Sequence, residues 1–172
     1  YAIENAGQLY WFAQEVNGGK TGINAVLTAN ITVNSGVLKA DGSIADDVSG
    51  FRSWTPIGNS DNKYTGTFDG KGYTVSGLYF KDTSKEEVGL FGHLGSGGKI
   101  SNVGVLDSYF EFRMMGGGIC GCNYGEINNC SNGGTVIGNT GSGAGGVCGM
   151  NYGTIKDCKN TGSVSGSVDD TG

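Results

Sequence analysis

The chain has 172 residues, 37% of them hydrophobic and 35 of them glycine, which fits one folded domain over 1–172 better than a disordered segment. Its net charge is -5 and it has no run of Lys and Arg that could follow a phosphate backbone, which excludes nucleic acid as a partner. No run of eighteen apolar residues is present and no basic and apolar leader precedes Tyr1, so we expect no membrane insertion and a piece or a mature form of a longer protein.

The first predicted element is an amphipathic helix over residues 5–19. Asn5 is a typical N-cap with Gln8 three residues later, and Gly18 follows the last apolar position. One face carries the apolar side chains of Leu9, Phe12, Ala13 and Val16. We expect this helix to cap the exposed end of a stack of strands, because its polar face is not basic enough for a membrane surface.

Residues 24–33 predict one or two short strands, and the polar stretch 34–53 is expected to leave the main body as an excursion. Three aspartates lie in that stretch: Asp41, Asp46 and Asp47. They lack the D-x-D-x-D-G spacing of a calcium loop, and so does the loop 59–63. We predict no cofactor and no metal site, with calcium in either loop as the alternative that the sequence leaves open.

The middle of the chain alternates predicted strands with polar segments. Residues 64–80 predict two strands, punctuated by D-G and K-G. Their expected core residues are Phe68, Val75 and Leu78. The segment KDTSKEE at 81–87 is predicted as a polar loop, and DSYFEFRMM at 107–115 as a bulge or an extra strand.

Two regular repeats follow, at 117–138 and 145–166. At an offset of 28 residues, 13 of their 22 positions are identical. Each repeat has six or seven glycines and only short apolar runs, which excludes a helical repeat and leaves short strands joined by tight N-Y-G and N-G-G turns. The sequence therefore predicts an all-β fold, a right-handed parallel β-helix (solenoid) of five or six rungs with the helix as a short N-terminal cap.

Degenerate copies of the repeat extend upstream over 24–116, with loop excursions. G-L-F-G matches G-I-C-G, so that Phe91 occupies the position of Cys120, and I-S-N-V matches I-N-N-C, so that Val103 occupies the position of Cys130. Residues at equivalent positions of a β-helix lie about 4.8 Å apart on successive rungs. Asparagine above asparagine and cysteine above cysteine are then expected to form ladders.

The chain has five cysteines: Cys120, Cys122, Cys130, Cys148 and Cys158. Their spacing does not match the paired C-x2-C of zinc sites. We predict mostly buried, reduced thiols, with Cys120 next to Cys148 and Cys130 next to Cys158, acting as small hydrophobic side chains. A disulfide between stacked positions is the alternative.

The motif G-G-I-C-G-x-N-x-G-x-I-x-N-C and its second copy resemble the GLUG repeat of large secreted and cell-surface bacterial proteins, which include some IgA-cleaving peptidases and adhesin-like proteins. The upstream W-T-P-I-G and G-T-F-D-G-x-G-Y-T-V-S-G-L are similar to the segment that commonly precedes such repeats. Departures are Asn30, where Asp is usual, and Cys120 and Cys148, where an aliphatic residue is usual. The resemblance implies an extracellular β-helix module, secreted or attached to the cell surface, and implies no chemistry.

The enzymatic alternative is a β-helix that binds or degrades polysaccharides with clustered carboxylates. The regular repeats contain only four charged residues, with no carboxylates at equivalent positions: Glu126, Lys156, Asp157 and Lys159. The single histidine, His93, has no nucleophile motif around it and is interpreted as a surface residue. We therefore predict no catalytic residues and a structural or adhesion module.

Tyr124 and Tyr152 share one position in the N-Y-G turns, so we expect them to stack at a solvent-facing corner. They are the candidate ligand contacts, because tyrosine rings beside asparagine amides can hold a sugar. The alternative is that they stiffen the corner. Expected partners are a glycan or protein on a host or microbial surface and the flanking domains of the same chain. Since no second amphipathic segment follows 162–166, we also expect an open C-terminal end to which further repeats or a domain attach.

Overall fold

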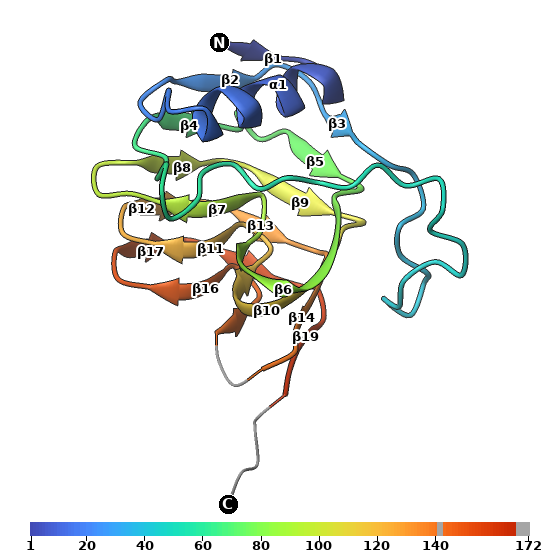
Figure 1. Cartoon of the computed structure of the whole chain (residues 1–172). Coiled ribbons are helices and arrows are strands. Elements are labelled where there is room, and N and C mark those ends of the chain that lie inside the picture. The colour runs from blue at the N-terminus through green and yellow to red at the C-terminus, as the bar shows by residue number, and fades with distance from the viewer. Residues whose placement is uncertain (141–142, 168–172) are drawn as a thin grey trace, which may run out of the picture.

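The computed structural model describes residues 1–140 and 143–167. Helix α1 (Ala6–Asn17) lies at the N-terminal end, and short strands stack below it as a parallel β-helix of about six turns (Figure 1). The prediction of a β-helix with an N-terminal helical cap is confirmed. Among the described residues, no helix is long and apolar enough to cross a membrane.

Four sheets form the walls of the stack, and all pairings between their strands are parallel. The first sheet contains β1 (Ala2–Ile3), β2 (Ala25–Leu27), β4 (Thr67–Asp69), β8 (Lys99–Ser101), β12 (Glu126–Asn128) and β17 (Thr154–Lys156). The second contains β3 (Ile31–Thr32), β5 (Thr74–Ser76), β9 (Gly104–Leu106), β13 (Ser131–Asn132) and β18 (Lys159–Asn160). The third contains β6 (Tyr79–Val88), β10 (Tyr109–Gly117), β14 (Thr135–Gly138), β19 (Val164–Gly166) and β15 (Ala144–Gly145), which also pairs with β10. The fourth contains β7 (Phe91–Leu94), β11 (Cys120–Asn123) and β16 (Cys148–Asn151).

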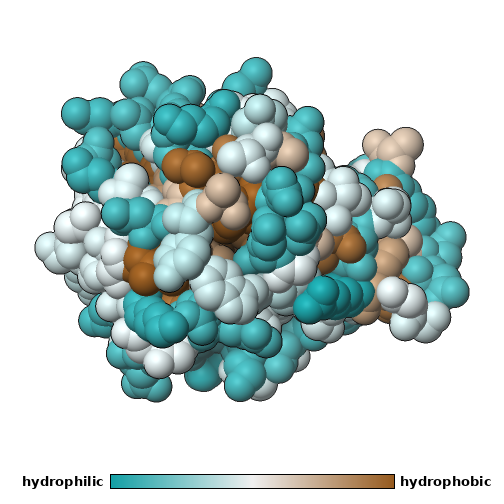
Figure 2. All heavy atoms as spheres, turned by 90° about the horizontal axis from the view of Figure 1, so that it is seen from above, coloured by the Kyte–Doolittle hydropathy of each residue, from teal (hydrophilic) through white to brown (hydrophobic). Residues whose placement is uncertain are grey.

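Helix α1 begins and ends as its sequence predicts. The Asn5 side chain accepts a hydrogen bond from the Gln8 N–H at 3.0 Å, and the Gln8 side chain accepts one from the Glu4 N–H at 2.8 Å. Gly18 forms the C-cap. The buried face comprises Leu9, Tyr10, Phe12, Ala13 and Val16. Seen from above, this end of the molecule shows mostly hydrophilic and intermediate residues, with apolar side chains between them (Figure 2).

The core is built from columns of side chains in register. In the first sheet, Phe68, Ile100 and Ile127 are fully buried neighbours on successive strands. The predicted core residues Val75 and Leu78 are also fully buried. Lower in the stack some inward positions hold polar or small side chains. Asn132 lies one turn below Val105 in the second sheet, and Cys120 lies one turn below Phe91 in the fourth.

The corner between the first and second sheets repeats one backbone conformation. Asn102, Asn129 and Asp157 have φ of 55°, 51° and 52°, the left-handed region that asparagine and aspartate tolerate better than most residues. The Asn129 side-chain amide donates to the side-chain oxygen of Asn102 at 2.8 Å, and the Asn102 side-chain amide donates to the Asp69 carboxylate at 2.9 Å. A column of polar side chains therefore holds successive turns together at this corner.

The prediction of a polar loop at 81–87 is wrong, because this segment continues strand β6. Its backbone pairs with β10, and the charged side chains form cross-strand pairs: Lys81 lies 3.3 Å from Glu111, and Glu86 lies 2.9 Å from Arg113. A strand whose solvent-exposed face carries charged residues has a composition similar to that of a loop, and the sequence alone does not distinguish the two. The segment 107–115 is largely an extra strand, β10, with a register shift between Phe112 and Met114.

The excursion at 34–53 is confirmed. It forms no strand and only two isolated bridges, an antiparallel one between Leu38 and Ile44 and a parallel one between Ser53 and Tyr79 where it rejoins the stack. The excursion projects from one side of the stack (Figure 1). The Asp107 carboxylate holds its first part, accepting the backbone N–H groups of Gly36, Val37 and Leu38 at 2.9, 3.2 and 2.8 Å. The predicted open C-terminal end falls largely on 168–172, outside the described residues.

Candidate functional site

Tyr124 and Tyr152 lie side by side at the corner that follows β11 and β16. Their ring centroids are 4.8 Å apart with an interplanar angle of 16°, and the residues are 45% and 59% exposed. The structure therefore places them as the sequence predicts, stacked and facing solvent.

The aromatic column continues to His93. Its ring stacks on Tyr124 with a centroid distance of 5.5 Å and an angle of 4°, and the Lys63 amine lies 5.8 Å from the centre of the Tyr124 ring. In the preceding turn the position of Tyr124 is taken by Gly95, since Asn123 pairs with Leu94. The glycine leaves no ring at that level, and the imidazole stacks on Tyr124 instead.

The interpretation of His93 as a surface residue is wrong. It is 4% exposed, and its Nδ1 lies 2.9 Å from the Glu87 carboxylate. Its Nε2 is buried and has no hydrogen-bond partner among the described residues. Sequence reasoning missed this pair because it took 81–87 for a loop, whereas the end of β6 brings Glu87 over β7 and β11.

The asparagines beside the tyrosines have structural roles. Asn123 is fully buried, donates to Asn151 at 2.7 Å and accepts the Gly125 N–H at 2.9 Å. The predicted asparagine ladder is thus present, but the Asn123 amide has no free group for a sugar. Asn151 is exposed, but its side-chain oxygen also accepts the Gly153 N–H and its amide donates to the Gly153 carbonyl, both at 3.3 Å.

A second ladder follows one sheet further along. The Asn132 side chain, also fully buried, donates to Asn160 at 2.9 Å and accepts the Gly134 N–H at 3.0 Å. A Cβ on Gly118 would lie 2.2 Å from Asn132, and a Cβ on Gly146 would lie 2.2 Å from Asn160. The repeated glycine therefore makes room for the repeated asparagine.

All five cysteines carry free thiols. Cys120 pairs in register with Cys148, and the Cys158 sulfur accepts the Cys130 N–H at 3.4 Å, so both predicted neighbour pairs are present. The three cysteines of the first regular repeat are buried, and Cys148 and Cys158, in the second, are half-buried. Burial raises the pKa of the Cys130 thiol to about 12, and burial together with the nearby Glu87 carboxylate raises that of Cys122 to about 11.

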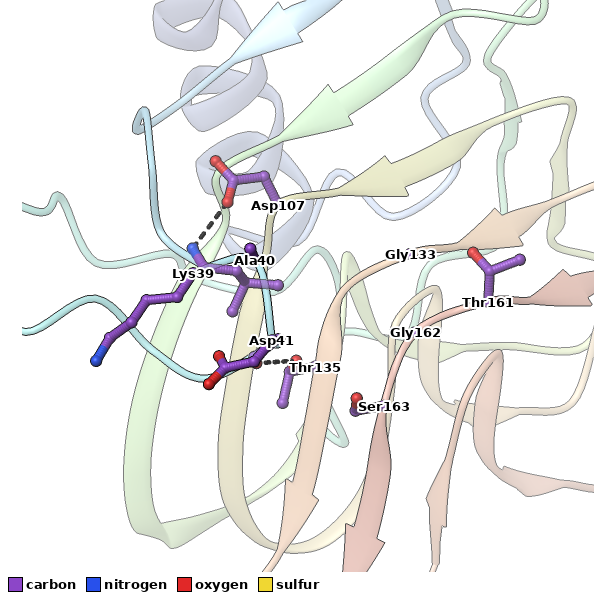
Figure 3. Close-up of a pocket in the computed structure, with 11 residues that line it drawn as sticks. Lys39, Ala40, Asp41, Asp107, Gly133, Thr135, Thr161, Gly162 and Ser163 are labelled. Atoms are coloured by element: carbon purple, nitrogen blue, oxygen red, sulfur yellow. Dashed lines mark hydrogen bonds between the residues drawn. The ribbon is translucent and has the colours of Figure 1, made fainter.

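A polar groove of about 420 Å³ lies between residues 38–42 of the excursion and the stack (Figure 3). The Thr135 hydroxyl donates to the Gly42 carbonyl at 2.7 Å and ties the excursion to β14. Thr161 and Ser163 line the opposite wall, and the Lys39 amine points away from them (Figure 3). The groove thus offers hydroxyl groups, with Asp41 as a charged group at its rim.

The aspartates of the excursion are occupied by their own loop. Asp41 and Asp47 accept hydrogen bonds from the backbone and hydroxyl of Ser43 and Ser49, which hold the pKa of both carboxyls below the usual value. Asp46 pairs with Lys39. In the part of the chain that the structure describes, no three His, Cys, Asp or Glu side chains gather as a metal site.

The chain matches no model of a known protein family. Over 81 residues, 45% of this chain and 9% of the relative, it is 33% identical to a "Putative Gly-rich membrane protein" of Evansella cellulosilytica. Over 113 residues, 66% of this chain and 1% of the relative, it is 32% identical to "Halomucin" of Haloquadratum walsbyi. The chain therefore corresponds to a small part of both curated relatives.

Among solved structures, the chain is similar to the crystal structure of a "putative immunoglobulin A1 protease" from Bacteroides ovatus. The TM-score is 0.57 at 21% sequence identity, and the match covers 98% of this chain and 58% of the other. At that identity the likeness shows the fold alone, a repeat-built β-helix.

Proposed function

We propose that the chain is a non-catalytic structural module, a spacer or scaffold of the GLUG-repeat type, in a bacterial surface or secreted protein. The observation that carries the proposal is the use of its polar side chains: the asparagines of the repeats bond to the next turn and the aspartates of the excursion bond to their own loop. Such ladders stiffen a stack and leave few groups free for chemistry.

The relatives support an extracellular role. One is named a membrane protein and the other a halomucin, and in both the matching segment is at most 9% of the length. A module that forms a small part of a long chain is the arrangement expected of a spacer, since each turn contacts only its neighbours and the stack can be extended. Its partners in this proposal are the flanking parts of the same chain.

The second candidate is carbohydrate binding, with or without cleavage. The exposed stack of Tyr124 and Tyr152, with Lys63 near the Tyr124 ring, favours it, because aromatic faces and polar groups hold sugars. Two rings offer a small contact area, which favours the structural role for them.

Replacing both tyrosines by alanine separates the two candidates, with Tyr73→Ala as the control at another exposed tyrosine. For a spacer we expect a loss of about 0.5–1.5 kcal/mol of stability from the broken stack and no change in glycan-array or cell binding. If the wild type binds a glycan and the double variant loses that binding while its melting temperature is unchanged, the corner is a recognition site and the spacer proposal is wrong.

A further inference from the structure

A second groove, of about 360 Å³, lies where two neighbouring turns of the chain separate and meet again. The turns are bridged at Ser53 to Tyr79 and again at Ile57 to Phe91. Between these bridges one turn runs over residues 54–56 and the next over 80–90, so the longer segment bows outward. The space left between them is the groove, whose volume lies within the range of ligand pockets.

The lining of this groove is partly apolar and partly charged. Its apolar residues are Trp54, Pro56, Phe80 and Val88, and its charged residues are Asp82, Lys85, Glu86 and Glu87. Glu86 is paired with Arg113 at 2.9 Å. Hydrogen bonds from Ser84, and then the charge of Lys85, hold the pKa of Asp82 below its usual value. Glu87 differs from both, because its contact is to an imidazole.

Glu87 carries a charge that no lysine or arginine of residues 1–140 and 143–167 neutralises in an ion pair. Its side chain is 15% exposed, and His93 Nδ1 lies 2.9 Å from one of its oxygens. The imidazole is neutral, because a second proton would sit on the buried Nε2, which has no acceptor among the described residues. Since buried charges in proteins are normally paired, Glu87 leaves a place for a cation beside the groove.

The backbone of Glu87 is fixed by two glycines. Its φ is 60°, a left-handed conformation that glutamate adopts rarely. A Cβ on Gly92 would lie 2.7 Å from the Glu87 carbonyl oxygen, and one on Gly121 would lie 2.6 Å from the Glu87 carbonyl carbon. The glycines let the adjoining strands close on Glu87, which holds the residue in place before any partner binds.

One wall of the groove is a strand edge. Strand β6 pairs with β10 on one side, and on its other side the described residues bridge it at Tyr79 alone. This second edge faces residues 54–59 across the groove. An extended peptide can pair with such an edge, and the register shift of β6 opposite Phe112 and Met114 restricts regular pairing to a short segment.

We propose that this groove binds an arginine side chain on an extended segment of a partner protein. The guanidinium pairs with Glu87, the aliphatic stem packs on Pro56 and Phe80, and the peptide backbone follows the edge of β6. Arginine fits better than lysine, because its planar guanidinium forms two parallel hydrogen bonds to a carboxylate and stacks on aromatic faces. Such a site adds to the spacer role and does not depend on it.

The test is a heteronuclear NMR titration of the whole chain with the blocked tripeptide acetyl-Val-Arg-Val-amide. Its citrulline analogue keeps the shape and removes the charge. We expect the arginine peptide to shift the Trp54 indole N–H and the Phe80 amide, and the citrulline peptide to bind at least about 10-fold more weakly. Glu87→Gln still accepts the His93 proton but lacks the charge, and should weaken the arginine peptide by about 10-fold.

The matched control is Glu126→Gln, which removes an exposed carboxylate of the first sheet that lies 3.5 Å from Lys99. It should bind the arginine peptide as the wild type does. Lys85→Glu adds a negative charge at an exposed position of the rim and should strengthen binding by about two- to fivefold. This variant keeps the test decisive if Glu87→Gln does not fold, which circular dichroism checks.

The proposal is overturned if neither peptide binds, if the citrulline peptide binds equally well, or if the shifts appear at another face, such as that of Tyr124. It is also overturned if Glu87→Gln and Lys85→Glu leave the affinity unchanged. Shifts of the same groove resonances on raising the protein concentration alone would assign the groove to a second copy of the chain and would overturn it as well.

Discussion

The upper turns of the β-helix and the two regular repeats at 117–166 share one backbone path but are held together differently. Above, an aromatic cluster fills the space under α1: the ring of Phe68 lies 6.0 Å from Phe12 and 5.2 Å from Phe91, which in turn lies 5.3 Å from Tyr64. In the regular repeats the buried side chains are aliphatic residues, cysteines, asparagines and a threonine, and both tyrosines are exposed.

The difference explains where the repeat is visible in the sequence. A hydrogen-bonded ladder requires the same amide on successive turns, as Asn123 and Asn151 show, and its neighbouring glycines must be kept as well. Apolar packing needs only a suitable volume, so Phe91 and Cys120 can share one column. Repeats are therefore most alike where polar contacts, rather than apolar burial, join the turns.

The largest effect is expected in the upper region from Phe68→Ala. Phe68 is fully buried between Phe12 and Phe91, and its truncation should lower the free energy of unfolding by about 3–5 kcal/mol. The counterpart on the last turn is Ile155→Ala, which should cost much less because Ile155 is only half-buried. Urea denaturation measures both, and equal losses would contradict the contrast between the two regions.

In the regular repeats the critical change is Asn132→Ala. It leaves the buried Gly134 N–H without its acceptor and Asn160 without its donor, which should cost about 1–3 kcal/mol. Asn132→Val copies the side chain of Val105 one turn above and should not restore stability, because the N–H stays unpaired. Thermal and urea unfolding measure the stability of both variants. An Asn132→Val variant as stable as the wild type would show that the asparagine ladder is not needed for stability.

Alkaline pH should lower the stability of the regular repeats through the buried thiol of Cys130. Burial raises the pKa of its thiol from 9.0 to about 12, so the folded state keeps the proton while the unfolded chain loses it. Stability from this group is fully present below pH 9 and falls between pH 9 and 12 by about 1.4 kcal/mol per pH unit. Denaturant unfolding at pH 8 to 11 should show a shallower decline for Cys130→Val; identical slopes would mean that the thiol is not responsible.

The smallest effect is expected at the helical cap. Asn5→Ala removes the acceptor of the Gln8 N–H and should cost about 1 kcal/mol, whereas Asn5→Asp keeps an acceptor and should stay near the wild type. Melting temperatures of the two variants measure this. A loss as large as that of Phe68→Ala would indicate that α1 governs the whole stack rather than covering its end.

The sequence by itself determined the repeat, the strand and turn pattern, the helical cap and the column of Tyr124 and Tyr152. These features follow from local rules: glycine and asparagine specify turns, apolar spacing specifies the helix, and a fixed period places equivalent residues on successive turns.

Only the tertiary structure decided the surroundings of His93. A charged segment such as 81–87 reads as a loop until its backbone is seen to pair with β10, because a solvent-facing strand and a loop have similar compositions. That pairing carries Glu87 to the imidazole and buries it. The register of β7, β11 and β16 then sets His93, Cys122 and Met150 side by side, a neighbourhood that depends on how three turns stack and not on any one of them.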